Sequence, residues 1–213
     1  MSVSLWNSRL VSESSERLNW SSQPGDGREP GARSGVRGET LRADLREPAA
    51  IEALVAGAEK PFLELEPADW GEVLAVDLRV PALCARAAAR AMVARRRARI
   101  INIASISATE PAARLAPYCA SKAGLVRLTR VMALEPARHN VQVNCVCPGD
   151  FATPMNAAFF ATAAGQAAIA RAIPMRRLGA PAELGPVIVF LASEASSFMT
   201  GSVITVDGGQ SLT

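Results

Sequence analysis

Short apolar runs and helical patterns follow one another along the chain from about residue 41 onward. The runs Arg99–Ala104 (RIINIA) and Val141–Val146 predict buried strands. Between them, the segment from about Leu115 to Leu134 has the spacing of a helix. A further helix is predicted from about Pro181 to Ser193, and a last strand follows at Ser202–Val206.

A longer helix is predicted in front of these elements. It opens at Pro67 and runs to about residue 97. Pro81 removes the hydrogen bond to the carbonyl four residues earlier, so we expect a kink near Asp77. Upstream, the sequence LRADL at 41–45 ends a short strand, and an amphipathic helix is predicted from Pro48 to about Glu59.

The first 40 residues have a different composition. From Asn7 to Thr40 large apolar residues are few, and most of the rest are Ser, Arg, Gly, Glu and Pro. Such a segment buries too little surface to offset the entropy lost on ordering. We therefore expect residues 1–40 to be a disordered or irregular N-terminal segment, and residues 41–213 to form the folded domain.

The candidate chemistry centres on Tyr118, which is the one tyrosine of the chain. Lys122 lies four residues further on, so both side chains share a face of the predicted helix. Ser105 stands at the end of the strand before it and can face them. A free phenol has a pKa of about 10, and a neighbouring ammonium lowers that pKa. A serine hydroxyl can donate to a substrate carbonyl while the tyrosine moves the proton. The alternative is a surface Tyr-Lys pair without a chemical role.

The order of motifs narrows these alternatives. A strand ending in a serine is followed by Y-x-x-x-K, a second strand, Pro148-Gly149 and, at 206–209, the sequence VDGG. This arrangement resembles the short-chain dehydrogenase/reductase family from about Leu41 to Thr213. The resemblance implies an α/β fold with a three-layer Rossmann-like parallel sheet and helices on both faces. It also implies NAD or NADP as cofactor, a small-molecule substrate, and assembly into homodimers or homotetramers.

The resemblance also implies roles for individual residues. Tyr118 matches the general acid/base, Ser105 the group that orients the substrate carbonyl, and Lys122 the cation that binds the nicotinamide ribose. Asp77 stands where the family has an asparagine that holds a water for proton relay; the alternative is a polar residue at a kink. Residues matching cofactor contacts are Asp44, Leu45, Tyr118, Lys122, Pro148, Gly149, Phe151 and Thr153. For Asp44 the alternative is a turn or a helix cap.

Two parts of the family pattern are not found in the sequence. The family has a glycine-rich turn between a first strand and a helix, where the cofactor pyrophosphate binds. The glycines of this chain between Gly25 and Gly38 follow no apolar strand, so we assign them no phosphate-binding role. The family's Asn-Asn-Ala-Gly strand is also lacking, because Glu59-Lys60 runs directly into PFLEL. We therefore expect a Rossmann-like sheet that is incomplete on its N-terminal side.

Composition and charge argue against other classes of function. The net charge is +3, and no basic stripe carries interleaved aromatic residues, which disfavours nucleic-acid binding. Cys145 and Cys147 alternate along one predicted strand, no C-x-x-C pair occurs, and His139 is the single histidine, so no metal site is expected. No apolar run approaches the roughly 20 residues that span a membrane. We expect no membrane association and a cytoplasmic protein with reduced thiols.

Two functions remain open from the sequence. The first is an NAD(P)-dependent oxidoreductase that interconverts a secondary alcohol and a ketone, with a sugar-acid-like or 3-oxoacyl-like substrate. The second is a catalytically inactive, truncated family member that acts only as an oligomer or assembly partner. The absence of the glycine-rich motif favours the second, whereas the intact Ser105, Tyr118 and Lys122 pattern favours the first.

Overall fold

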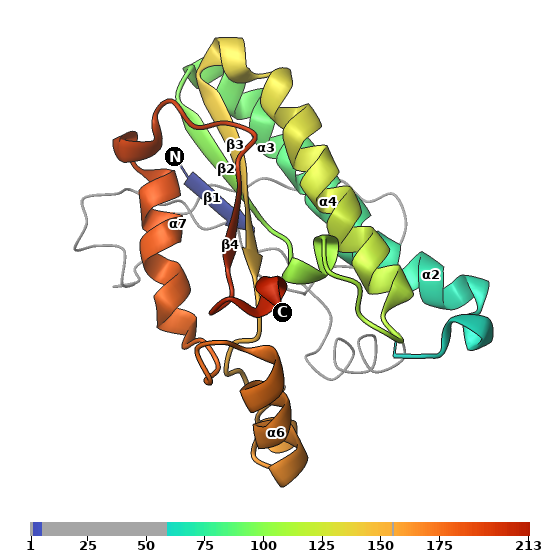
Figure 1. Cartoon of the computed structure of the whole chain (residues 1–213). Coiled ribbons are helices and arrows are strands. Elements are labelled where there is room, and N and C mark those ends of the chain that lie inside the picture. Colours follow the sequence, from blue (N-terminus) through green and yellow to red (C-terminus); the bar gives the residue numbers. More distant parts are fainter. Residues whose placement is uncertain (1, 6–58, 155) are drawn as a thin grey trace.

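The fold is built around a parallel β-sheet with helices on both faces (Figure 1). The computed structural model describes residues 2–5, 59–154 and 156–213. Within them, the sheet has four parallel strands in the order β1-β2-β3-β4. The strands are β1 (Ser2–Leu5), β2 (Ala98–Ile103), β3 (Val141–Pro148) and β4 (Val203–Val206). The α-helices are α2 (Pro67–Leu74), α3 (Val80–Arg95), α4 (Ala116–Leu134), α5 (Ala157–Phe160), α6 (Ala163–Ala172) and α7 (Gly185–Ala192).

Helices α3 and α4 cover one face of the sheet and α7 covers the other (Figure 1). On the first face, Met92 of α3 packs with Ile100 and Val143 of the central strands. On the second face, Leu191 of α7 packs with Ile101 and Val146. Strands β2 and β3 are buried on both sides because helices cover both faces of the parallel sheet, although they also bury polar side chains such as Gln142 and Asn144. The expected three-layer α/β architecture is confirmed.

The structure differs from the sequence-based expectation at the start of the chain. Ser2–Leu5 form β1, which pairs in parallel with β2 so that Ser2 lies opposite Arg99 and Leu5 opposite Asn102. A strand of four residues on the edge of an existing sheet needs little apolar surface of its own, because β2 supplies its hydrogen-bond partners. The other residues of the expected irregular segment lie outside the described residues. So do Asp44, Leu45 and the helix expected from Pro48.

The kink expected near Asp77 is a short π-helix. This segment, η3 (Ala75–Arg79), joins α2 to α3, and Pro81 follows in the first turn of α3. Pro81 has no backbone N–H to donate, so the regular helical ladder is interrupted just before it. A π-helical turn widens the helix locally and often occurs at functional sites. Here it carries Asp77 toward α4, against which η3 packs.

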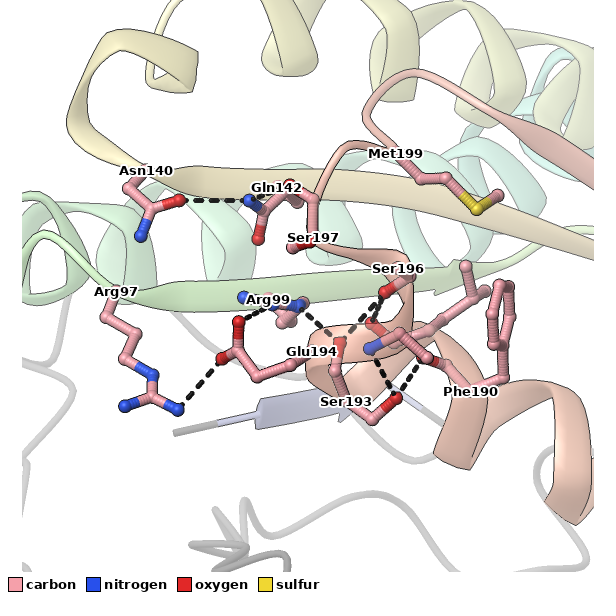
Figure 2. Close-up of polar contacts among 12 residues, drawn as sticks. Arg97, Arg99, Asn140, Gln142, Phe190, Ser193, Glu194, Ser196, Ser197 and Met199 are labelled. Atoms are coloured by element: carbon pink, nitrogen blue, oxygen red, sulfur yellow. Dashed lines mark hydrogen bonds and ion pairs between the residues drawn. The ribbon is translucent and has the colours of Figure 1, made fainter.

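A buried arginine ties the start of β2 to the end of α7 (Figure 2). The Arg99 side chain is only 5% exposed, and its Nη2 lies 3.5 Å from Glu194 Oε2. Its Nε donates to the carbonyl of Ser193, the residue that caps α7, at 3.3 Å. A cation is favourable at this position because helix carboxyl ends carry partial negative charge and free carbonyls. Arg97 pairs with the same glutamate at 2.8 Å, but its side chain is 71% exposed.

Because Arg99 is buried and Arg97 is exposed, we expect their substitutions to lower the free energy of unfolding by different amounts. We expect Arg99→Met to lower the free energy of unfolding by about 1–3 kcal/mol, because the Ser193 carbonyl loses one of its donors and Glu194 loses its buried cation. Arg97→Met is the matched control, and an exposed pair of this kind contributes less than about 1 kcal/mol. Urea unfolding of both variants measures the difference. Equal losses in the two variants would contradict the structural role given to Arg99.

Among the described residues, no helix is both long enough and apolar enough to cross a membrane. In the same part of the chain, no group of three or more His, Cys, Asp or Glu side chains is arranged to hold a metal ion.

Candidate active site

The candidate site lies at the carboxyl ends of β2 and β3, where ligands bind in open parallel α/β sheets. Ser105 follows β2 and caps the short helix η4 (Ile106–Ala108), with its Oγ accepting the backbone N–H of Ser107 at 3.1 Å. The hydroxyl proton of Ser105 is not used in that bond, so it can still be donated. Helix η4 packs against α4, which carries Tyr118 and Lys122.

Tyr118, Lys122 and Asp77 meet between α4 and the π-helical turn. Lys122 Nζ lies 5.4 Å from the centre of the Tyr118 ring and 3.1 Å from Asp77 Oδ1. The side chains of Lys122 and Asp77 are 13% and 22% exposed, so this ion pair is largely shielded from water. The helical spacing sets the first contact. The second contact joins residues 45 positions apart and depends on how η3 packs against α4.

Cys147 lies on the side of the sheet that faces Lys122. Strand β3 turns Cys145 and Cys147 toward α4, where both are buried in one cluster with Leu125 and Val126. A hydrogen bond with Cys147, together with burial, raises the pKa of Cys145. The same bond lowers the pKa of Cys147, and the Ser105 backbone and the Lys122 charge act in that direction.

The loop that follows β3 is fixed from two sides. On one side, Gly149 N donates to the carbonyl of Val206 in β4 at 3.0 Å. On the other side, Phe151 pairs with Gly179, and Ala152 N donates to the Gly179 carbonyl at 2.9 Å. A Cβ on Gly179 would lie 2.5 Å from the Phe151 ring, so the close approach requires a glycine.

Asn156 completes the loop and was not identified from the sequence. Its Nδ2 donates to the Phe151 carbonyl at 2.8 Å, and its Oδ1 accepts the Thr153 N–H at 2.9 Å. Asparagine is frequent in turns because its short side chain bonds to nearby backbone, but only the fold shows which loop Asn156 closes. The loop borders a cavity of about 200 Å³, lined by Pro148, Gly149, Asp150, Phe151, Thr153, Asn156, Pro181 and Leu184.

The structure therefore brings together most of the residues selected from the sequence. Lys122 contacts both Asp77 and Tyr118, and Ser105 stands on the adjacent turn. The expected cofactor loop follows the next strand, β3, and includes Pro148, Gly149, Phe151 and Thr153. Asp44 and Leu45 lie outside the described residues.

The cavity beside the loop is small for a whole dinucleotide. Its volume of about 200 Å³ is below the roughly 300–1,000 Å³ of typical ligand pockets. It has room for one ring-sized group, so the described residues fit the nicotinamide end of the implied cofactor. Lys122, which was expected to bind the adjoining ribose, is not among the residues that line this cavity and contacts Asp77.

A family model described as "Enoyl-(Acyl carrier protein) reductase" matches residues 33–211, which is most of the chain. Among curated relatives, the 5-keto-D-gluconate 5-reductase of Escherichia coli K12 is 40% identical over 163 residues. That match covers 75% of this chain and 64% of the reductase. The inactive 2-(S)-hydroxypropyl-CoM dehydrogenase 2 of Xanthobacter autotrophicus is 34% identical over 189 residues, covering 78% of this chain and 82% of the relative.

A solved structure has the same fold. The gluconate 5-dehydrogenase of Burkholderia cenocepacia, crystallised with NADP and tartrate, superposes with a TM-score of 0.70 and 36% identity. The alignment covers 73% of this chain and 61% of that enzyme. The chain thus spans less than two thirds of the length of this enzyme and of the E. coli reductase.

Proposed function

The chain belongs to the short-chain dehydrogenase/reductase family, and we propose that it is an NAD(P)-dependent oxidoreductase interconverting a secondary alcohol and a ketone. The observation that carries the proposal is the meeting of Tyr118, Lys122 and Asp77 beside the turn that begins at Ser105. A bound nicotinamide cofactor would supply or accept the hydride. The residues of the chain would then orient the carbonyl and move the proton.

Each side chain has a role suited to its position. Ser105 donates its hydroxyl proton to the substrate oxygen, which holds the carbonyl in place. The Tyr118 hydroxyl acts as general acid in reduction and as general base in oxidation. The Lys122 ammonium lies 5.4 Å from the centre of the Tyr118 ring and donates to the cofactor ribose. Asp77 fixes the lysine through its carboxylate.

The similarity to a reductase of a keto sugar acid favours a sugar-acid-like substrate. The gluconate 5-dehydrogenase structure, which holds tartrate, supports the same class. A 3-oxoacyl compound is the alternative substrate. NAD and NADP are both compatible with the described residues, because Asp44 and the segment around it lie outside them.

Cofactor binding tests the proposal, and the chain offers a matched control. It has two lysines, each paired with an aspartate: Lys122 with Asp77, and Lys60 with Asp69 at 2.8 Å. We expect saturable binding of NADH or NADPH in a fluorescence titration. Lys122→Ala should weaken that binding about tenfold or more, and Lys60→Ala should change it less than about twofold.

The proposal fails if the folded chain binds neither nucleotide at millimolar concentration, or if both lysine variants lose affinity equally. Circular dichroism shows whether each variant is folded. The sugar-acid assignment is tested separately by turnover of 5-ketogluconate against a 3-oxoacyl thioester. Reduction of the thioester alone would contradict it.

A second candidate function is assembly without catalysis. Apolar side chains are exposed on α3 and α4, including Leu83, Val131 and Leu134, and Phe198 is exposed beyond α7. A family relative named as inactive supports this alternative. A homodimer or homotetramer is expected under either function. A stable oligomer by light scattering, without nucleotide binding, would favour assembly alone.

A further inference from the structure

The side-chain amide of Gln210 makes two hydrogen bonds to the loop that follows β3. The backbone N–H of Asp150 donates to Gln210 Oε1 at 3.0 Å. In return, Gln210 Nε2 donates to Asp150 Oδ2 at 2.9 Å. A carboxamide has both a donor and an acceptor, so it can hold the backbone and the side chain of one residue together. The two residues are 60 positions apart in the sequence.

The turn that presents Gln210 is itself fixed. Gly208 and Gly209 have φ of 63° and 87°, a left-handed conformation that favours glycine. The Asp207 carboxylate accepts the N–H groups of Gly209 at 2.9 Å and of Ser211 at 2.7 Å. Burial on its own would raise the pKa of Asp207, but these hydrogen bonds outweigh it and lower the pKa. An ionised carboxylate therefore holds the turn at neutral pH.

The loop and the turn are in direct contact. A Cβ added to Gly149 would lie 2.6 Å from Asp207 Cβ and 2.7 Å from Gln210 Oε1. There is no room for a side chain between the loop and the turn, and the two hydrogen bonds of Gln210 join them. Asp150 and its neighbours form one wall of the cavity of about 200 Å³. The position of that wall therefore depends on Gln210.

We propose that Gln210 is a positioning residue, whose amide sets the conformation of the loop 148–153 and thereby the affinity for the nicotinamide cofactor. This inference rests on the proposed function, because it assumes that the nicotinamide end binds against this loop. Gln210 acts through Asp150, which lines the cavity, and is not itself among the lining residues.

The proposal is tested by exchanging the amide and the carboxylate between positions 210 and 150. Gln210→Glu places two carboxylates against each other and removes the donor to Asp150. We expect the Kd for NADH or NADPH to rise about tenfold and the Asp150 amide to lose protection from hydrogen exchange. Adding Asp150→Asn restores a donor opposite the new carboxylate, so both quantities should return to within about twofold of those of Asp150→Asn alone. Asp150→Asn keeps both contacts with Gln210, and it serves as the reference because Asp150 itself lines the cavity.

The two measured quantities test two separate parts of the proposal. Unchanged amide exchange in Gln210→Glu would overturn the role of Gln210 in holding the loop. Lost protection with an unchanged Kd would overturn the link to cofactor affinity, as would failure of Asp150→Asn to rescue the Kd. If Gln210→Glu does not fold, Gln210→Met replaces it, and the same two quantities are measured. If the parent binds no nucleotide, the proposed function fails, while exchange without cofactor still tests the loop.

Discussion

Tyr118→Phe should lower kcat by about 10²–10⁴-fold, because it removes the hydroxyl that exchanges a proton with the substrate oxygen. The ring remains, so its contact with the Lys122 ammonium, 5.4 Å from the ring centre, is kept. Cofactor affinity should therefore change far less than kcat. Steady-state kinetics with a keto sugar acid, together with a nucleotide titration, measures the two effects.

The single tyrosine makes this a sharp test. No second phenol exists in the chain that could replace the lost one. A Phe variant that kept more than about a tenth of the parent kcat would mean that Tyr118 is not the general acid/base. A large loss of cofactor affinity with a normal kcat would mean that the Tyr118 hydroxyl binds the cofactor and does not transfer the proton.

Lys122→Met should lower the free energy of unfolding by about 2 kcal/mol, a value between those of exposed and fully buried ion pairs. The intermediate value follows from the exposure of the pair, 13% for Lys122 and 22% for Asp77. The substitution leaves the Asp77 carboxylate without its cation in a partly buried place. Urea unfolding of the cofactor-free chain measures the loss.

A double-mutant cycle isolates the ion pair from the packing of the lysine stem. Asp77→Asn keeps an acceptor for Lys122 and should cost less than the lysine substitution. Combining the two should cost clearly less than the sum of the single losses, because the stranded carboxylate is then absent. Strict additivity would mean that the 3.1 Å contact contributes nothing to stability. These measurements need no cofactor, so they remain valid if the chain does not catalyse.

The Asp77–Lys122 pair also bears on the comparison of the two candidate functions. Asp77 stands where the family resemblance led us to expect an asparagine, and its carboxylate contacts the lysine directly. An asparagine at this position would still offer an oxygen to accept the Lys122 hydrogen bond. Asp77→Asn should therefore not abolish turnover if the enzyme is active.

Local rules of the sequence determined the central features of this protein. The helical period places Lys122 on the same face as Tyr118, and the apolar run before Ser105 predicts a strand that ends at the site. Pro81 indicates the break in the helix at Asp77, because a missing N–H disrupts a helix whatever surrounds it. Each of these features depends on residues within about one or two helical turns of each other, so the sequence alone suffices.

Only the tertiary structure decided the contacts between distant segments. The pairing of β1 with β2, the Asp77–Lys122 ion pair, and the hold of Gln210 on Asp150 join parts of the chain that no periodicity relates. Such contacts depend on strand register and on how helices pack across the sheet, which the local pattern of residues leaves undetermined. Cys147 shows the same limit, because the sequence places it on a strand face, and only packing brings it to Lys122 and Ser105.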